Sequence, residues 1–185
     1  MFIWSGDRKL FLAIIKLLDR TTGDIRELDP RHAETIHELF FLTGHRLLSS
    51  SNAGLRLWNL HSDEFEILSD QVEKWPWGQA GPARGALGDG DRYLVLDTPG
   101  GIHLWDLDQR TDRRLPIPSA GTLSLAISPD GRFIVAGRTD GEVLVLPREA
   151  DTPHVLMGHD QPVRCLWISP ESDEIRSVDR HGKLC

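Results

Sequence analysis

Cysteine is scarce in this chain of 185 residues, which contains only Cys165 and Cys185. Two cysteines provide neither the ligand spacing of a metal site nor a disulfide framework. Cys165 falls in an alternating strand-like run, and we expect it to pack as a small hydrophobic side chain. This cysteine usage fits a reducing compartment, so we expect the protein to be cytoplasmic.

Excess positive charge is also missing. The chain has 21 lysines and arginines against 28 aspartates and glutamates, a net charge of −7. Surfaces that bind nucleic acid or anionic membranes need clustered basic residues, so we expect neither partner. One basic cluster, formed by Arg110, Arg113 and Arg114, is interrupted by Asp108 and Asp112. We therefore expect it to be a solvated strand end.

No apolar run is long enough to span a membrane. The longest candidate, residues 10–15, is interrupted by Lys16 and has no small-residue cleavage site. A membrane helix needs about 20 apolar residues. We instead expect residues 14–18 to form a strand of a partial repeat.

Common catalytic motifs are missing as well. The eight histidines show no metal-ligand spacing, since His32 and His37 are five residues apart. Residues 49–51 lack the flanking glycines of a nucleophile elbow, and no glycine-rich phosphate loop is present. The sequence predicts no metal site, no cofactor and no catalytic residue, so we expect a protein that is not an enzyme.

An internal repeat is the main feature that is present. Similar apolar runs occur at residues 55–60, 102–107 and 143–146. Trp58 and Trp105 are 47 residues apart, and the matching Leu146 follows 41 residues later. A period near forty residues predicts a repeat architecture.

Each repeat unit contains four strand-like segments. Turn-forming clusters of Gly, Pro and Asp separate them, and Leu123, Leu125 and Ile127 show the two-residue alternation of a half-buried strand. Four short strands in about forty residues are typical of a propeller blade. The prediction is an all-β fold of blades with four antiparallel strands, with about three full blades and a partial blade at each end.

From about residue 12 to its end, the chain resembles the WD-repeat β-propeller family. The matching residues comprise two tryptophan dipeptides, a glycine-histidine pair and two turns: Trp105-Asp106, Trp58-Asn59, Gly158-His159, Asp140-Gly141 and residues 128–132.

The repeats depart from the family at a polar network. In the family a histidine, a serine or threonine, an aspartate and a tryptophan form a buried network within one blade. The aspartate position holds Asn52, Pro99, Asp140 and His181 in successive units. Since an unsatisfied buried donor costs about 1–3 kcal/mol, we expect these blades to depend mainly on apolar packing.

We interpret residues 1–185 as a single propeller region. Its expected units are residues 1–28 (partial), 29–68, 69–118, 119–152 and 153–185 (partial). The two partial units could combine to close a ring of about four blades, or the chain could be a segment of a longer propeller. We expect a segment, because the last unit stops in mid-blade, and such a segment could associate through an open propeller edge.

The resemblance implies a noncatalytic scaffold that presents rigid propeller faces to protein or peptide partners. Trp75 and Trp77 are the first candidates for contact, since paired aromatics are enriched at binding hot spots; alternatively, they cover apolar surface at a blade edge. Gln161 and Arg164 are weaker candidates. Two other functions stay open, a propeller-fold hydrolase with a site in the central channel and a regulatory sensor region of a larger multidomain protein.

Overall fold

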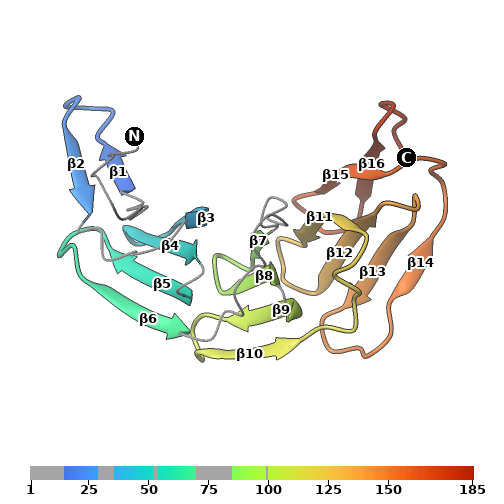
Figure 1. Cartoon of the computed structure of the whole chain (residues 1–185), viewed down its shortest axis with the longest axis horizontal. Helices are drawn as coiled ribbons and strands as arrows, with labels where there is room; N and C mark the ends of the chain where they lie inside the picture. The colour runs from blue at the N-terminus through green and yellow to red at the C-terminus, as the bar shows by residue number, and fades with distance from the viewer. Residues whose placement is uncertain (1–14, 29–35, 52–53, 70–84, 99) are drawn as a thin grey trace, which may run out of the picture. The chain divides into compact units, whose positions relative to one another are not determined.

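The computed structural model describes residues 15–28, 36–51, 54–69, 85–98 and 100–185 (Figure 1). The regular elements in these ranges are antiparallel β-strands, which confirms the prediction of an all-β fold. Within the described residues, no helix has the length and apolar character needed to cross a bilayer. The chain divides into two compact units, residues 1–79 and 80–185, and each is described separately.

Three sheets have four strands each, and in each sheet the strands lie side by side in chain order (Figure 1). Blade I consists of β3 (Ile36–Leu42), β4 (Arg46–Ser51), β5 (Gly54–Asn59) and β6 (Phe65–Ser69). Blade II consists of β7 (Gly85–Gly88), β8 (Tyr93–Thr98), β9 (Gly101–Asp106) and β10 (Thr111–Arg114). Blade III consists of β11 (Thr122–Ile127), β12 (Phe133–Arg138), β13 (Val143–Pro147) and β14 (His154–Leu156).

Two further sheets in the described ranges have two strands each. The first unit begins with β1 (Ile15–Leu18) paired to β2 (Ile25–Leu28). The second unit ends with β15 (Val163–Ile168) paired to β16 (Ile175–Asp179). The structure therefore confirms three full blades of four antiparallel strands with a partial blade at each end. The division into units at the predicted residue boundaries stays a prediction.

In the first unit, the β1–β2 pair packs on blade I. Ile15 and Leu28 join Leu47 and Trp58 in one buried apolar cluster. The indole Nε1 of Trp58 in β5 donates a hydrogen bond of 2.8 Å to the hydroxyl of Ser49 in the neighbouring strand β4. The polar atom of this buried tryptophan therefore has a partner within its own blade.

In the second unit, blade III is buried on both faces. One face, with Ile134 and Leu146, packs against the apolar side chains of blade II, including Val95. The opposite face, with Val135 and Val143, packs against Val163 of β15 and its neighbours. Successive side chains of a strand point to opposite faces, so an unbroken apolar run is what a strand between two neighbours requires. Apolar packing is therefore the main contact between blades in this unit.

A glycine at a tight turn allows blade III to approach the last sheet. Gly141, in the turn between β12 and β13, has a φ of +90°, and a Cβ there would collide with the backbone carbonyl of His159. Gly182, in the turn after β16, has a similar φ of +85°, but a Cβ there would meet no atom within 4 Å. Both glycines therefore have a backbone conformation that would strain an L-residue. They differ in the space that a Cβ atom would find.

This difference gives a matched pair of substitutions. Both Gly141→Ala and Gly182→Ala should lose about 1–2 kcal/mol of unfolding free energy, because an L-residue is strained at positive φ. Gly141→Ala should lose about 1–3 kcal/mol more, because the methyl group has to displace backbone. Urea unfolding of the two variants measures the difference, and equal losses would show that the close approach to His159 is not needed.

Candidate functional site

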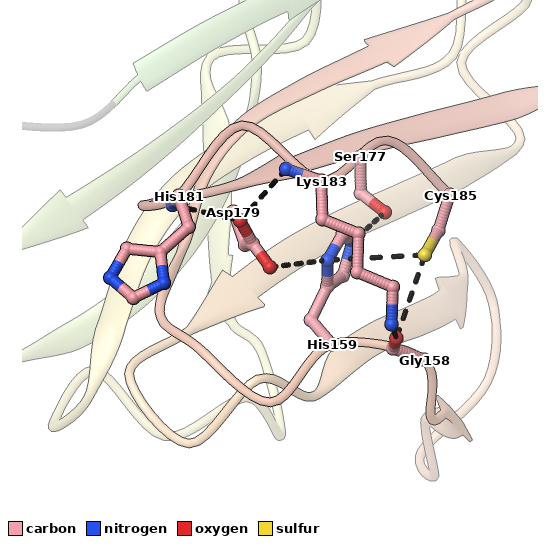
Figure 2. Close-up of polar contacts among 7 residues, drawn as sticks. All are labelled: Gly158, His159, Ser177, Asp179, His181, Lys183 and Cys185. Carbon is pink, nitrogen blue, oxygen red and sulfur yellow. Dashed lines mark hydrogen bonds and ion pairs between the residues drawn. The ribbon is translucent and has the colours of Figure 1, made fainter.

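A buried polar network lies at the start of the last sheet (Figure 2). His159 precedes β15, and its ring contacts two side chains of β16. Its Nε2 lies 2.8 Å from the hydroxyl of Ser177, and its Nδ1 lies 3.2 Å from Oδ2 of Asp179. All three residues are at most 6% exposed. The network therefore ties the segment before β15 to β16.

Backbone amides fix the carboxylate of this network. The amides of His181 and Lys183 donate to Oδ1 of Asp179 at 2.9 and 3.0 Å. Burial tends to raise the pKa of Asp179, but these two backbone hydrogen bonds and the contact with His159 together hold that pKa below its ordinary value. Asp179 is thus held as a carboxylate.

The connectivity of Ser177, His159 and Asp179 is that of a serine hydrolase triad. In such a site the hydroxyl has to reach a substrate carbonyl. The exposed fraction of Ser177 is 6%, and that of His159 is the same. In this conformation the network braces the sheet and presents no accessible nucleophile.

Two groups close the outer side of the network (Figure 2). The ammonium of Lys183 donates a hydrogen bond of 2.6 Å to the carbonyl of Gly158. The thiol of Cys185 lies 3.6 Å from the same carbonyl and 3.9 Å from Nδ1 of His159. The residues after β16 therefore help to hold the Gly158–His159 pair in place.

The partner of His159 differs from the residue that the repeat alignment placed there. The alignment put His181 at the aspartate position, whereas the structure brings Asp179 to His159. Ser177 and Asp179 are two residues apart in one strand and so share a face, a signal that the sequence contained. Asp140 instead lies in a turn, where it accepts hydrogen bonds from the side chain of Arg138 and the amide of Glu142.

The two repeat tryptophans also differ. Trp105 is buried like Trp58, but its Nε1 has no hydrogen-bond partner among the described residues. The position that Ser49 holds relative to Trp58 is held by Leu96 relative to Trp105, nine residues earlier in each case. Blade II therefore has no hydroxyl at the position from which Ser49 satisfies Trp58 in blade I.

A groove of about 360 Å³ lies in the second unit, lined by residues of blade II and by the segment after β13. We call it the blade II–III groove. Its charged and aromatic lining includes Arg92, Tyr93, Asp106, Arg113, Arg148 and Glu149. The strand register pairs Tyr93 with Asp106, Asp106 with Thr111, and Leu104 with Arg113, so these side chains lie on one face of blade II.

One wall of the groove is an aromatic ring that two guanidinium groups contact. The guanidinium of Arg92 lies 4.9 Å from the ring centre of Tyr93, and that of Arg148 lies 4.4 Å from it. Arg92 also donates a hydrogen bond of 2.9 Å to Asp106. Burial tends to raise the pKa of Asp106, but the hydrogen bond from Arg92 and the amide of Gln109 hold it below its ordinary value. The wall is thus fixed before any ligand binds.

Arg113 is the unusual residue of the groove. It is partly buried, and its Nη2 atom is buried without a hydrogen-bond partner among the described residues. Arg110 and Arg114 are exposed, as expected for a solvated strand end. Nothing in the sequence indicated that Arg113 would differ from Arg110 and Arg114.

The other predicted contact residues do not line this groove. Trp75 and Trp77 lie outside the described residues. Gln161 is partly exposed and Arg164 is exposed at the start of β15, and neither belongs to the groove. A search of the described part of the chain finds no group of three or more histidine, cysteine or acidic side chains that could hold a metal ion.

The lowered pKa of Asp179 gives a pH prediction. Because its folded pKa lies below the unfolded value of about 3.9, the carboxylate stabilises the fold above that pH, and the contribution is lost as pH falls through the folded pKa. Asp179→Asn should therefore unfold at lower urea concentration than the wild type at pH 7, and the difference should narrow below about pH 3.9.

Asp151→Asn is the control for this experiment, because it removes an exposed carboxylate with the same change of charge. It should change the urea midpoint little at either pH. A difference between wild type and Asp179→Asn that stays constant from pH 7 to pH 3 would contradict a stabilising role for the ionised carboxylate.

Comparison with known proteins agrees with the blade topology. The family model of the WD domain, G-beta repeat, matches residues 114–145, which span most of blade III. The meiotic recombination protein rec14 of Schizosaccharomyces pombe is 28% identical over 178 residues, covering 92% of this chain and 57% of the relative.

A solved structure shows the same fold. A chain in the crystal structure of the mitotic checkpoint complex matches with a TM-score of 0.66 and 15% identity, over 90% of this chain and 51% of that one. This chain thus spans slightly more than half the length of either relative. The repeat motifs, the four-stranded blades and these matches agree: the chain is similar to WD-repeat β-propeller proteins, and residues 114–145 match the WD-repeat model itself.

Proposed function

We propose that the protein is a noncatalytic binding module that presents its blades to protein or peptide partners. The observation that carries this proposal is the blade II–III groove, a concave site whose charged and aromatic side chains are fixed on packed strands. Groups held in place before binding lose little conformational entropy when a partner arrives. Such a site is suited to recognition.

The buried network supports the noncatalytic part of the proposal. Ser177, His159 and Asp179 have the connectivity that a hydrolase needs, but burial keeps the hydroxyl from substrate. Their hydrogen bonds join two segments of one sheet, which is a structural role. The burial therefore favours a scaffold over a propeller-fold hydrolase.

The relatives support a role within a larger assembly. One is named as a meiotic recombination protein, and the solved neighbour is a chain of the mitotic checkpoint complex. We propose that this chain likewise acts by holding protein partners, without assigning it to either process. Cys165 is exposed, so the expectation that it packs as a small hydrophobic side chain was wrong. Cys165 and Cys185 are both free, which supports our proposal of a reducing compartment such as the cytoplasm.

The binding function can be tested by comparing folded and unfolded chains. The side chain of Ile134 is fully buried between blades II and III, so Ile134→Asp should unfold the second unit. Wild-type protein is immobilised on a resin and incubated with an extract of its own cells. It should retain a protein in near-stoichiometric amount that immobilised Ile134→Asp does not retain. The retained protein and the wild-type chain, each purified, should then re-form the complex.

Two results would count against the proposed function. One is that no protein is retained by the wild type above the level on Ile134→Asp. The other is hydrolysis of p-nitrophenyl acetate that Ser177→Ala abolishes while the variant stays folded, because that would identify Ser177 as an accessible nucleophile. We expect wild type and Ser177→Ala to release nitrophenol at the same low rate.

A further inference from the structure

The blade II–III groove has one more positively charged side chain than its ion pairs use. Arg92 pairs with Asp106 at 2.9 Å, and Arg148 with Glu149 at 2.7 Å. Asp112, which also lines the groove, lies 2.8 Å from Nδ1 of His103. Each acidic side chain that lines the groove therefore already has a partner, and no ion pair is formed by Arg113 among the described residues.

An unpaired guanidinium in such a place is costly. Arginine keeps its charge at all ordinary pH values, and a buried donor without an acceptor loses the hydrogen bonds that water gave it. The buried Nη2 atom of Arg113 is in this state. An acceptor that enters the groove would pair with the side chain of Arg113 where it lines the groove, and would supply the partner that this charge lacks among the described residues.

The chemistry of arginine points to the acceptor. A guanidinium presents parallel N–H groups that match the two oxygens of a carboxylate, and hydrogen bonds between charged groups are stronger than neutral ones. Arg92 and Arg148, whose guanidinium groups lie over the buried ring of Tyr93, add positive charge to the same groove. The groove thus offers a charge partner to a carboxylate.

The strand beside the groove favours an extended peptide. Thr111, Asp112 and Arg113 of β10 all line the groove, and β10 is the outermost strand of blade II. Among the described strands it pairs with β9 alone. An outermost strand can hydrogen-bond with an extended segment of a partner, with side chains of that segment placed in neighbouring pockets.

We propose that the blade II–III groove binds an extended acidic peptide segment of a partner protein, with a glutamate or aspartate carboxylate paired to Arg113. This inference rests on the proposed binding function and specifies the partner's chemistry at one site. It also assigns the contact to a residue other than Gln161, Arg164 or the tryptophans at positions 75 and 77.

The test uses a fluorescent hexaglutamate peptide, acetylated and amidated at its ends, with hexaglutamine as the neutral control. Anisotropy titrations at low ionic strength should show binding of hexaglutamate and none of hexaglutamine. Arg113→Gln should weaken hexaglutamate binding by roughly tenfold or more. Arg164→Gln, which makes the same change of charge at an exposed residue outside the groove, should leave binding unchanged.

Folding of the variant gives an independent readout. Arg113→Gln removes an unsatisfied group, so its urea midpoint should equal or exceed that of the wild type. Absence of hexaglutamate binding to the wild type, equal binding to Arg113→Gln, or equal loss in both arginine variants would overturn the proposal. Equal loss in both would mean that only diffuse charge attracts the peptide.

Photo-crosslinking separates failure of this inference from failure of the binding function. A benzophenone amino acid replaces Gln109, which lines the groove, or Glu171, an exposed residue between β15 and β16. A partner that crosslinks at position 171 and not at position 109 would overturn the groove proposal and leave the binding function standing. A purified partner that binds the chain and crosslinks at neither position would also overturn the groove proposal.

Discussion

Burial of blade III on both faces is the constraint on which the rest of the second unit depends. A single sheet of four short strands has two faces and cannot bury either alone. Ile134 and Leu146 are covered by blade II, while Val135 and Val143 are covered by β15 and its neighbours. The blade II–III groove borders the first of these interfaces, and the His159 network holds the sheet that covers the second. Both sites therefore depend on apolar packing at blade III.

The polar residues of the network differ from one repeat to the next, whereas the apolar pattern recurs in each. Blade I keeps the tryptophan and its serine, as Trp58 and Ser49, while blade II keeps Trp105 and has Leu96 in place of the serine. The last sheet keeps a histidine, a serine and an aspartate. Blade I and the β15–β16 sheet each satisfy a different part of the network, and the indole of Trp105 in blade II has no partner among the described residues. The shared requirement is the apolar pattern, because each blade needs it to cover its neighbour.

Periodicity predicted the strands because every blade repeats the same alternation, and the structure confirms the four-stranded sheets and the partial sheets at both ends. The partner of His159 was also within reach of the sequence, since Ser177 and Asp179 alternate along one strand. The groove could not be predicted from the sequence. Its lining comes from residues 92–93, 104–113 and 148–149, and a repeat pattern does not tell which charged side chains pair. The contact role of Trp75 and Trp77 stays a prediction.

Packed blades hold the groove in a fixed shape before a partner binds. Native-state hydrogen exchange of the free protein is the measurement that tests this statement. We expect the amides of β8, β9, β12 and β13 to exchange only through global unfolding, with protection equal to the unfolding free energy from urea, and those of the outer strand β10 to exchange faster. Exchange of β12 and β13 through local opening, at rates like those of β10, would contradict the claim.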